Sequence, residues 1–224
     1  KLHGGRKNLL LDLACGTGSL SEEFAKMGYD VIATDISQEM LNCALDKKFE
    51  SGLPIQYLCQ DMTELDLYGT ISGAVCMLDS LNHLDCAEDV AETIQKVGLF
   101  MEHNGIFIFD VNTIYKHREI LANNTFVYDC DDVYCVWQNS LNKDDSVDIS
   151  LDIFEYEDGA YYRSTEDFSE KAYPIDNYKK WLADADFEIL HIYDEMSDRD
   201  FNNKTQRAVF VARYNGYKNK SEER

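Results

Sequence analysis

The chain has 224 residues, of which 45% are hydrophobic, so it can bury one sizeable core but is short for two independent domains. Lys and Arg total 21 against 42 Asp and Glu, which gives a formal net charge of -21 at pH 7. A field of that sign repels polyanions, which argues against nucleic acid and anionic membrane surfaces as partners.

Short apolar runs, several of them β-branched, recur through the first half of the chain. They predict strands buried on both faces at residues 8–13, 30–34, 55–59, 71–78 and 105–111. Segments of helical period separate them, with apolar stripes formed by Leu20, Phe24 and Met27, then Met40, Leu41, Ala44 and Leu45, then Val90, Ile94, Val97 and Met101. This alternation predicts a parallel sheet with right-handed crossovers, whose ligands bind outside the carboxyl ends of the strands.

The pattern changes to period two between residues 126 and 173, with turn signals at 142–145 and 158–159. This predicts an antiparallel meander laid over the core, because the segment is too short and one-sided to bury a core alone. A helix is expected after Pro174, at residues 175–185, followed by terminal strands at 187–193 and 207–213.

The cysteines indicate the compartment. Seven cysteines, an odd number, do not form the paired framework of a small secreted scaffold, and no apolar stretch is typical of a signal peptide or a membrane span. Cys130 and Cys135 have no second Cys or His cluster nearby, which argues against zinc. We therefore expect a cytoplasmic protein that binds no metal and is a monomer or a homodimer.

The first strand runs directly into a turn with two glycines, Gly16 and Gly18, and a helix follows. Glycines there allow the backbone to turn sharply and approach a ligand, and the start of the helix offers free N–H groups. Asp35 ends the next strand, where an acidic side chain can accept hydrogen bonds from both hydroxyls of a ribose. These features predict a nucleoside cofactor.

The residues around this turn indicate which nucleoside is bound. A dinucleotide fingerprint requires a third glycine three residues after Gly18, where this chain has Ser21. Asp12 places a carboxylate just before the turn, which suits a cationic amino or sulfonium group and disfavours a pyrophosphate. The sequence therefore favours S-adenosylmethionine over NAD, although Asp12 can also act by hydrogen bonding that shapes the loop.

At these residues the chain resembles the class I S-adenosylmethionine-dependent methyltransferases. The resemblance covers about the first half of the chain and rests on 11–18, Asp35, 60–62, 76–84 and 105–110. It is closest to small bacterial enzymes with an inserted antiparallel sheet, similar to sugar N-methyltransferases. The implied fold is α/β: a Rossmann-like, doubly wound, mostly parallel seven-stranded sheet with a reversed C-terminal strand and an inserted antiparallel β-meander.

The resemblance also implies a division of labour along the single domain, residues 1–224. Residues 1–124 would form the cofactor-binding core, 125–173 an inserted sheet over the active site, and 174–224 the helix and strand pair that complete the core. Asp61 would contact the adenine amino group, Met62 the adenine ring, and the Leu78 carbonyl the methionine amino group. The full expected cofactor set is Asp12, Ala14, Cys15, Gly16, Gly18, Asp35, Ile36, Met40, Asp61, Met62 and Leu78.

Two departures from the family pattern bear on the acceptor. Relatives often carry Glu-x-His-x-x-Arg-x-Tyr at the exit of the inserted sheet, whereas residues 166–173 have Phe168 at the His position, so an acceptor role of that His does not carry over. Relatives also have helices before the first strand that cover the cofactor. This chain starts at Lys1, a few residues before its first strand, and we expect such a cover to be missing from it.

Methyl transfer from a sulfonium is an in-line displacement that needs alignment, exclusion of water and, for a protonated acceptor, a base. His83 and Asp79 follow the fourth strand and are the candidate catalytic residues; alternatively, His83 bonds to backbone and Asp79 caps the next turn. Aromatic residues of the insert either wall an acceptor pocket or form cross-strand pairs: Tyr128, Tyr134, Trp137, Tyr156, Tyr161 and Tyr162.

The sequence therefore predicts a methyltransferase that takes S-adenosylmethionine, releases S-adenosylhomocysteine and methylates N or O of a small molecule. Three alternatives stay open: a non-catalytic S-adenosylmethionine-binding module, an RNA methyltransferase, which the charge disfavours, and an NAD-linked oxidoreductase, which Ser21 disfavours.

Overall fold

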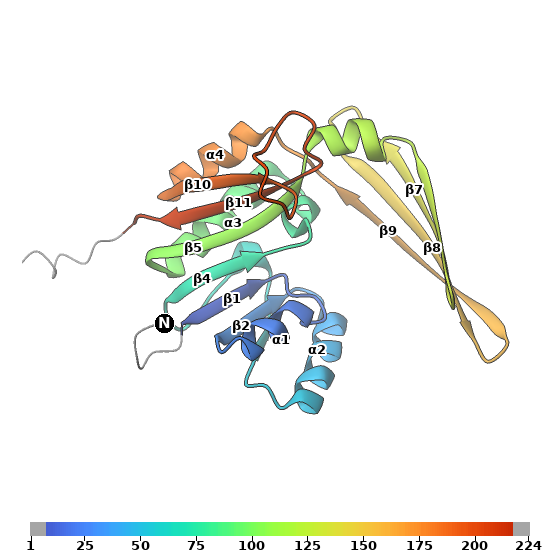
Figure 1. The fold of residues 1–224 in the computed structure, drawn as a ribbon, viewed down its shortest axis with the longest axis horizontal. Helices are drawn as coiled ribbons and strands as arrows, with labels where there is room; N and C mark the ends of the chain where they lie inside the picture. The colour runs from blue at the N-terminus through green and yellow to red at the C-terminus, as the bar shows by residue number, and fades with distance from the viewer. Residues whose placement is uncertain (1–7, 217–224) are drawn as a thin grey trace, which may run out of the picture.

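The computed structural model describes residues 8–216, which form two sheets. The larger sheet has the strand order β10-β11-β5-β4-β1-β2-β3 (Figure 1). Its strands are β1 (Leu9–Leu13), β2 (Asp30–Asp35), β3 (Gln56–Cys59), β4 (Ile71–Cys76), β5 (Met101–Asn112), β10 (Phe187–Asp194) and β11 (Arg207–Tyr214). Only β11 runs against its neighbours, so the mostly parallel seven-stranded sheet with a reversed C-terminal strand is confirmed. Strand order reverses between β4 and β1, where ligands of such sheets bind.

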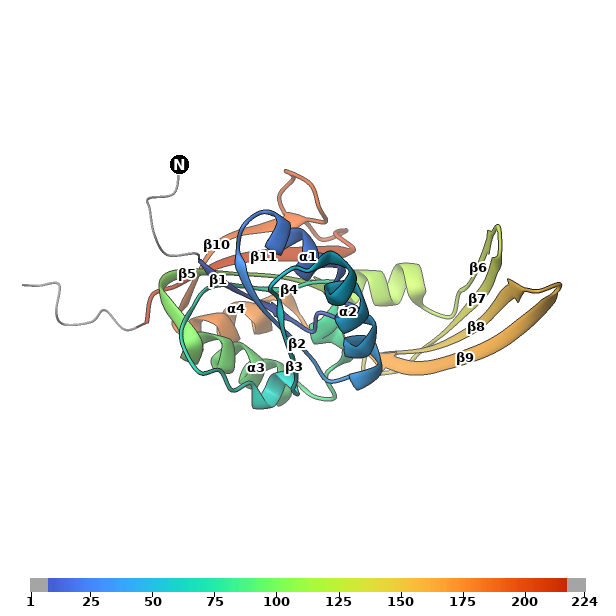
Figure 2. The same cartoon turned by 90° about the horizontal axis from the view of Figure 1, so that it is seen from below.

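Helices cover the two faces of this sheet separately (Figure 2). The α3 helix (Ala87–Phe100) and the α4 helix (Ile175–Asp184) pack on one face, where Ile94 and Tyr178 join the main core with Phe107 and Phe210. The α1 helix (Ser19–Lys26) covers Val31 and its neighbours on the other face, and α2 (Gln38–Ser51) packs beside β2 and β3. No helix within the described residues combines the length and apolarity required to cross a bilayer.

Three of the predicted apolar stripes differ in part from the structure. Met27, Met40 and Leu45 are 70%, 47% and 43% exposed, because α1 ends before Met27 and α2 buries only Leu41 and Ala44. Met101 is not the last residue of the third helix but the first of β5.

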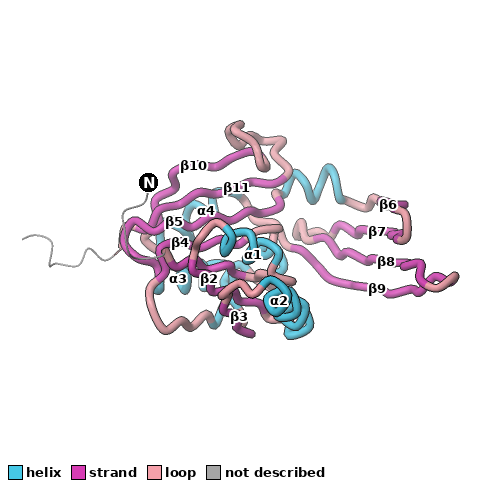
Figure 3. Tube along the Cα trace, turned by 60° about the horizontal axis from the view of Figure 1, so that its bottom comes forward, coloured by secondary structure: helices cyan, strands magenta, loops and turns pink. Residues whose placement is uncertain are grey.

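The second sheet is an antiparallel meander inserted after β5, with the order β6-β7-β8-β9. Its strands are β6 (Thr125–Cys130), β7 (Val133–Leu141), β8 (Val147–Glu157) and β9 (Ala160–Glu170), and the helical segment η3 (Lys116–Leu121) joins it to the core (Figure 3). Leu121, Val147 and Ile149 are buried where it meets η3, whereas the far half extends away from the seven-stranded sheet (Figures 1 and 2). The prediction that this insert covers the active site stays a prediction.

Candidate cofactor cleft and the polar network beside it

The turn after β1 wraps around the carboxylate of Asp35. Ala14, Gly16 and Gly18 all have left-handed backbone, with φ values of 57°, 55° and 74°. The Gly16 N–H donates to Asp35 Oδ2 at 2.7 Å, and Cys15 N–H donates to the Thr34 carbonyl at 2.9 Å. The other carboxylate oxygen of Asp35 accepts from the Ser37 N–H at 2.9 Å. Because each carboxylate oxygen has two lone pairs, both retain capacity for a further donor such as a ribose hydroxyl.

The two glycines of this turn have different surroundings. A Cβ at Gly16 would meet nothing within 4 Å, so open space faces the backbone there. A Cβ at Gly18 would lie 3.0 Å from Ala44 Cβ and closer still to the Tyr57 hydroxyl. Gly16 therefore provides the open cradle that a ligand needs, and Gly18 allows α1 to start close to α2 and β3.

Asp12 lies beneath the turn and is 2% exposed. Its Oδ2 accepts a hydrogen bond of 2.5 Å from the Ser21 hydroxyl, which ties the end of β1 to α1. Burial raises the pKa of Asp12 to about 6, the negative charge of Asp35 adds to this, and the Ser21 hydrogen bond opposes it. Ser21, which stands where a dinucleotide site has its third glycine, is thus the hydrogen-bond partner of Asp12. Both residues set this turn apart from a dinucleotide site.

A cleft lies at the carboxyl ends of β1, β2 and β3, and it collects six of the predicted residues: Ala14, Asp35, Ile36, Asp61, Met62 and His83. Six further residues complete its lining, and none of them has a role predicted from the sequence: Thr34, Gln60, Thr63, Leu84, Asp85 and Asp89. The remaining predicted residues lie outside this lining, either in the turn and beneath it, exposed on α2 (Met40), or after β4, where Leu78 is exposed and Asp79 is partly buried: Asp12, Cys15, Gly16, Gly18, Met40, Leu78 and Asp79.

The cleft suits a cationic nucleoside. Four carboxylates line it, from Asp35, Asp61, Asp85 and Asp89, and such a site attracts a sulfonium and repels a pyrophosphate. The four neighbouring strands β3, β2, β1 and β4 span about 14 Å at ordinary strand spacing, which matches an adenosine extended by an amino acid chain. The residues present therefore fit S-adenosylmethionine.

Asp61 and Met62 form the β3 side of this cleft. Asp61 starts the short helix η1 (Met62–Glu64), and its Oδ1 accepts from both the backbone N–H and the hydroxyl of Thr63 at 2.8 Å. The Met62 side chain packs against the main core. The carboxylate of Asp61 and the thioether of Met62 therefore offer a polar and an apolar contact to the same planar group.

The two candidate bases lie in different environments. His83 ends η2 (Ser80–His83), lines the cleft and packs against Phe168 of β9, with ring centroids 5.3 Å apart. Asp79 instead binds Arg207, with its Oδ2 3.1 Å from Arg207 Nη2, and its side chain does not cap η2, so the predicted capping role is wrong. Burial raises the pKa of Asp79, although the positive charge of Arg207 opposes the change.

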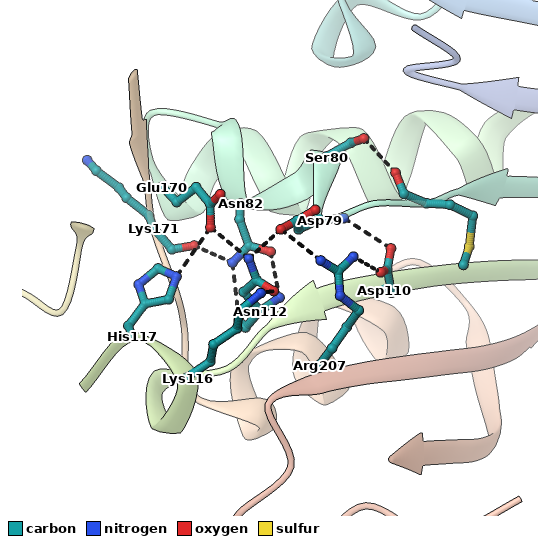
Figure 4. Close-up of polar contacts among 11 residues, drawn as sticks. Asp79, Ser80, Asn82, Asp110, Asn112, Lys116, His117, Glu170, Lys171 and Arg207 are labelled. Atoms are coloured by element: carbon teal, nitrogen blue, oxygen red, sulfur yellow. Dashed lines mark hydrogen bonds and ion pairs between the residues drawn. The ribbon is translucent and has the colours of Figure 1, made fainter. Parts of the chain in front are cut away.

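Asp79 belongs to a polar network that draws on five separate segments of the chain (Figure 4). Arg207 of β11 bonds to Asp79 and to Asp110 of β5. Asn112, at the end of β5, donates from its side chain to Asp79 and, at 2.7 Å, to Glu170 of β9. Among these residues, only Asp79 has a role predicted from the sequence; the local signal for the others is the polar pair at Asp110 and Asn112 after an apolar run.

Asn82 joins η2 to this network. Its side chain accepts from the Asn112 N–H at 2.9 Å and donates to the Asn112 and Lys171 carbonyls at 3.1 and 2.7 Å. Its carbonyl accepts from the Lys171 N–H at 2.7 Å, and the residue is fully buried. The turn that carries His83 is therefore fixed both to β5 and to the exit of the inserted sheet.

Glu170 and Lys116 complete the network on the side of the inserted sheet. Burial alone would raise the pKa of Glu170, but the His117 imidazole, whose Nε2 lies 3.5 Å from a Glu170 oxygen, and the hydrogen bond from Asn112 lower it overall. Lys116 donates to Asn112 Oδ1 at 2.9 Å, and burial together with the neighbouring Arg207 lowers its pKa. The network thus places opposite charges close together in a largely buried setting.

Five of the six predicted aromatic residues of the inserted sheet pack against another aromatic ring. Tyr128 packs against Trp137 with ring centroids 6.4 Å apart, and Tyr156 packs against Tyr161 at 5.1 Å. Tyr134 pairs with Phe154 of the next strand. None of the six aromatic residues lines the cofactor cleft, so these contacts match the cross-strand alternative.

The chain is similar to known methyltransferases in sequence and in fold. The pattern of a methyltransferase domain family matches residues 10–105. YqeM of Bacillus subtilis (strain 168), a protein named only as a methyltransferase, is 33% identical over 208 residues, covering 92% of this chain and 84% of YqeM. A crystal structure of an S-adenosylmethionine-dependent methyltransferase from Clostridium acetobutylicum superposes with a TM-score of 0.88 at 33% identity, over 93% of this chain and 84% of that one.

The sugar N-methyltransferase KedS8 from Streptoalloteichus has the same fold, with a TM-score of 0.75 at 17% identity over 93% of this chain and 80% of that one. The glycine turn, the acidic residue at the end of β2 and the two relatives at 33% identity lead to one conclusion. The chain belongs to the S-adenosylmethionine-dependent methyltransferases, whose methyl donor is S-adenosylmethionine and whose product is S-adenosylhomocysteine.

Proposed function

We propose that this enzyme methylates a nitrogen or oxygen of a small-molecule acceptor by in-line transfer. The observation that carries the proposal is the cleft in which Asp35, Asp61 and Met62 lie together with His83. When bound, S-adenosylmethionine supplies a methyl group made electrophilic by its sulfonium. The chain itself binds the donor, aligns it with the acceptor and excludes water from the site. No nucleophilic residue is required.

In this proposal each residue of the cleft contacts a different part of the donor. Asp35 accepts the ribose hydroxyls, Asp61 and Met62 contact adenine, and the open backbone at Gly16 faces the chain beyond the ribose. Asp12 contributes negative charge from beneath the turn, and the Leu78 carbonyl accepts from the amino group. Support comes from the strand order, which places these groups in sequence from β3 to β4.

His83 is our candidate for the base that removes a proton from the acceptor. It lines the cleft, and its ring forms no hydrogen bond to another of the described residues, so a ring nitrogen is available. Asp79 is less suited to this task, because its carboxylate is bound to Arg207 and Asn112. An acceptor placed between His83 and the donor would lie where β9 of the inserted sheet meets η2.

The decisive experiment uses S-adenosylmethionine labelled in its methyl group and a metabolite extract. We expect label to appear in a low-molecular-weight compound, and the His83→Asn variant to lose most of that transfer while it still binds S-adenosylhomocysteine. Binding without any transfer would instead identify a non-catalytic cofactor-binding module. Label in tRNA, with salt-sensitive binding, would identify an RNA methyltransferase.

The donor half of the proposal is tested by calorimetric titration with S-adenosylhomocysteine. Asp35→Ala removes the ribose acceptor and the partner of the Gly16 N–H, so we expect binding to weaken by at least about tenfold. Asp66→Ala, at an exposed acidic residue outside the cleft, should bind as the parent does. Equal affinity in the two variants would contradict the assignment of Asp35.

We also propose a reducing compartment, the cytoplasm, and a monomeric or homodimeric enzyme. All seven cysteines are free, which suits a reducing environment. Light scattering of the purified protein measures the oligomeric state directly, and a trimer or larger assembly would contradict this part of the proposal.

A further inference from the structure

The turn after β4 has a backbone that needs outside support. Leu78 and Asp79 are successive non-glycine residues with left-handed φ values of 62° and 54°. A turn of this kind persists only where surrounding contacts fix it. Here the contacts converge on Asp79, whose N–H donates to Asp110 Oδ1 at 3.1 Å and whose carboxylate accepts from Arg207 and Asn112.

Arg207 provides the charge that allows two carboxylates to share this place. Its guanidinium bonds to Asp79 with one nitrogen and to Asp110 with another (Figure 4). The Asp110 side chain is fully buried, so without Arg207 two poorly solvated negative charges would face each other. The planar fork of arginine suits two partners at once, whereas a lysine has a single charged nitrogen.

The clamped turn lies at one end of the donor site. Asp12 of β1 pairs with Val75 of β4, so the glycine turn and Leu78 leave adjacent strands at the same edge of the sheet. Asp61 and Met62 follow β3, which lies two strands beyond β1, on its other side. Under the proposed function, Leu78 therefore faces the amino acid end of the donor, and the adenine end is distant from the clamp.

We infer that Arg207 is a positioning residue for the donor: through Asp79 and Asp110 it holds the backbone of Leu78 in the conformation that binds the amino acid end of S-adenosylmethionine. This inference rests on the proposed donor orientation. Arg207 reaches the turn from β11, which lies 128 residues further along the chain than Asp79. It acts through Asp79 and Asp110 and does not touch the donor.

Two probes separate positioning from general stability. S-adenosylhomocysteine carries the amino acid end, whereas 5′-methylthioadenosine keeps the adenine, ribose and thioether but lacks that end. For Arg207→Gln we expect affinity for S-adenosylhomocysteine to fall by about tenfold, while affinity for 5′-methylthioadenosine stays within about twofold of the parent. Arg207→Lys should fall between the parent and Arg207→Gln with the first probe.

Arg213→Gln is the matched control, because it removes an arginine from the same strand whose partner, Glu188, is exposed. It should bind both probes as the parent does. Equal weakening of both probes in Arg207→Gln, or no weakening of either, would overturn the inference. If Arg207→Gln does not fold, the same comparison is made with Arg207→Lys, and amide hydrogen exchange at residues 77–84 should then be faster than in the parent.

Failure of the proposed function gives a different result. A parent enzyme that binds neither probe would contradict the donor site as a whole. A parent that binds both, with Arg207 variants indistinguishable from Arg213→Gln, would contradict only the role of Arg207.

Discussion

Gly16 and Gly18 share a left-handed backbone but differ in what a side chain would meet. Nothing lies within 4 Å of a Cβ at Gly16, whereas a Cβ at Gly18 would collide with the Tyr57 hydroxyl and press on Ala44. The hydroxyl of Tyr57 is buried and has no hydrogen-bond partner among the described residues. Gly16 is therefore required for its backbone conformation alone, whereas Gly18 is required both for its conformation and for the space left by its missing Cβ.

Substituting the two glycines in turn separates these causes. Gly16→Ala should cost about 1 kcal/mol in unfolding free energy, from backbone strain alone. Gly18→Ala should cost about 2 to 3 kcal/mol, because strain is joined by the steric clash. Urea denaturation measures both, and adding Tyr57→Phe should recover part of the Gly18→Ala loss but none of the Gly16→Ala loss. Equal costs for the two glycines would contradict the steric explanation.

The buried carboxylate of Asp12 makes stability depend on pH. Its pKa in the folded state, about 6, lies above the ordinary value of 3.8, so the folded protein binds more protons than the unfolded chain between these values. The free energy of unfolding should therefore fall as pH rises from about 4 to about 6, by an amount on the order of 3 kcal/mol. Below and above this window Asp12 adds no slope.

Two variants identify Asp12 as the source. Asp12→Asn should lack its share of the slope between pH 4 and 6 in urea midpoints. Ser21→Ala removes the hydrogen bond that lowers the pKa, so its slope should continue to higher pH than in the parent. The idea fails if Asp12→Asn shows the parent's full pH dependence.

At the scale of elements, η2 is held on two sides by a single side chain. Asn82 bonds to the end of β5 and to the segment after β9 through three hydrogen bonds of its side chain and one of its carbonyl. The turn with the candidate base is therefore coupled to the inserted sheet through ordinary amide contacts, and Phe168 of β9 adds a ring contact to His83.

Removing Asn82 should destabilise the protein strongly. Asn82→Ala leaves the buried Asn112 N–H and two carbonyls without their partner, and we expect a loss of about 3 kcal/mol in unfolding free energy by urea denaturation. Asn42→Ala, on the exposed side of α2 with one contact to Gln38, should change it by less than about 0.5 kcal/mol. A small effect at Asn82 would show that these bonds are replaced by water.

Local sequence patterns predicted most elements of this fold and their order. β-branched runs and turn signals located β1 to β5 and the inserted meander, because buried parallel strands and alternating antiparallel strands differ in period. Helical stripes were less reliable at Met40 and Leu45, since α2 lies where only part of its surface meets the sheet. Period alone does not report how much of a helix another element covers.

At the scale of the whole molecule, how well the site could be predicted depends on how far apart its interacting residues lie in the sequence. The glycine turn and Asp35, the last residue of β2, were predicted from their local context, and the roles of Asp61 and Met62 were implied by the family resemblance. The partnership of Asp79 with Arg207, 128 residues away, and of Asn82 with the Lys171 carbonyl, 89 residues away, has no local signal. Only the closure of the sheet by β11 and the return of β9 bring these residues together.

The inserted sheet should also be the least uniform part of the molecule in stability. Val147 and Ile149 are 0% and 2% exposed near η3, whereas Tyr156, Tyr161 and Tyr162 at the far end are 46%, 61% and 58% exposed. Amide hydrogen exchange should therefore be faster at residues 153–163 than at residues 147–151, because opening the far half exposes little new apolar surface. Uniform protection along β8 would indicate that the far half is covered in solution.

All twelve residues that line the donor cleft fall between Ala14 and Asp89, and none comes from the inserted sheet. The meander enters the chain only after β5, and it reaches this lining through the contact of Phe168 with His83. A chimera that receives the insert of another such enzyme should still bind S-adenosylmethionine but methylate a different acceptor. The fold thus separates the residues that line the candidate cofactor cleft from the strands that can vary with the acceptor.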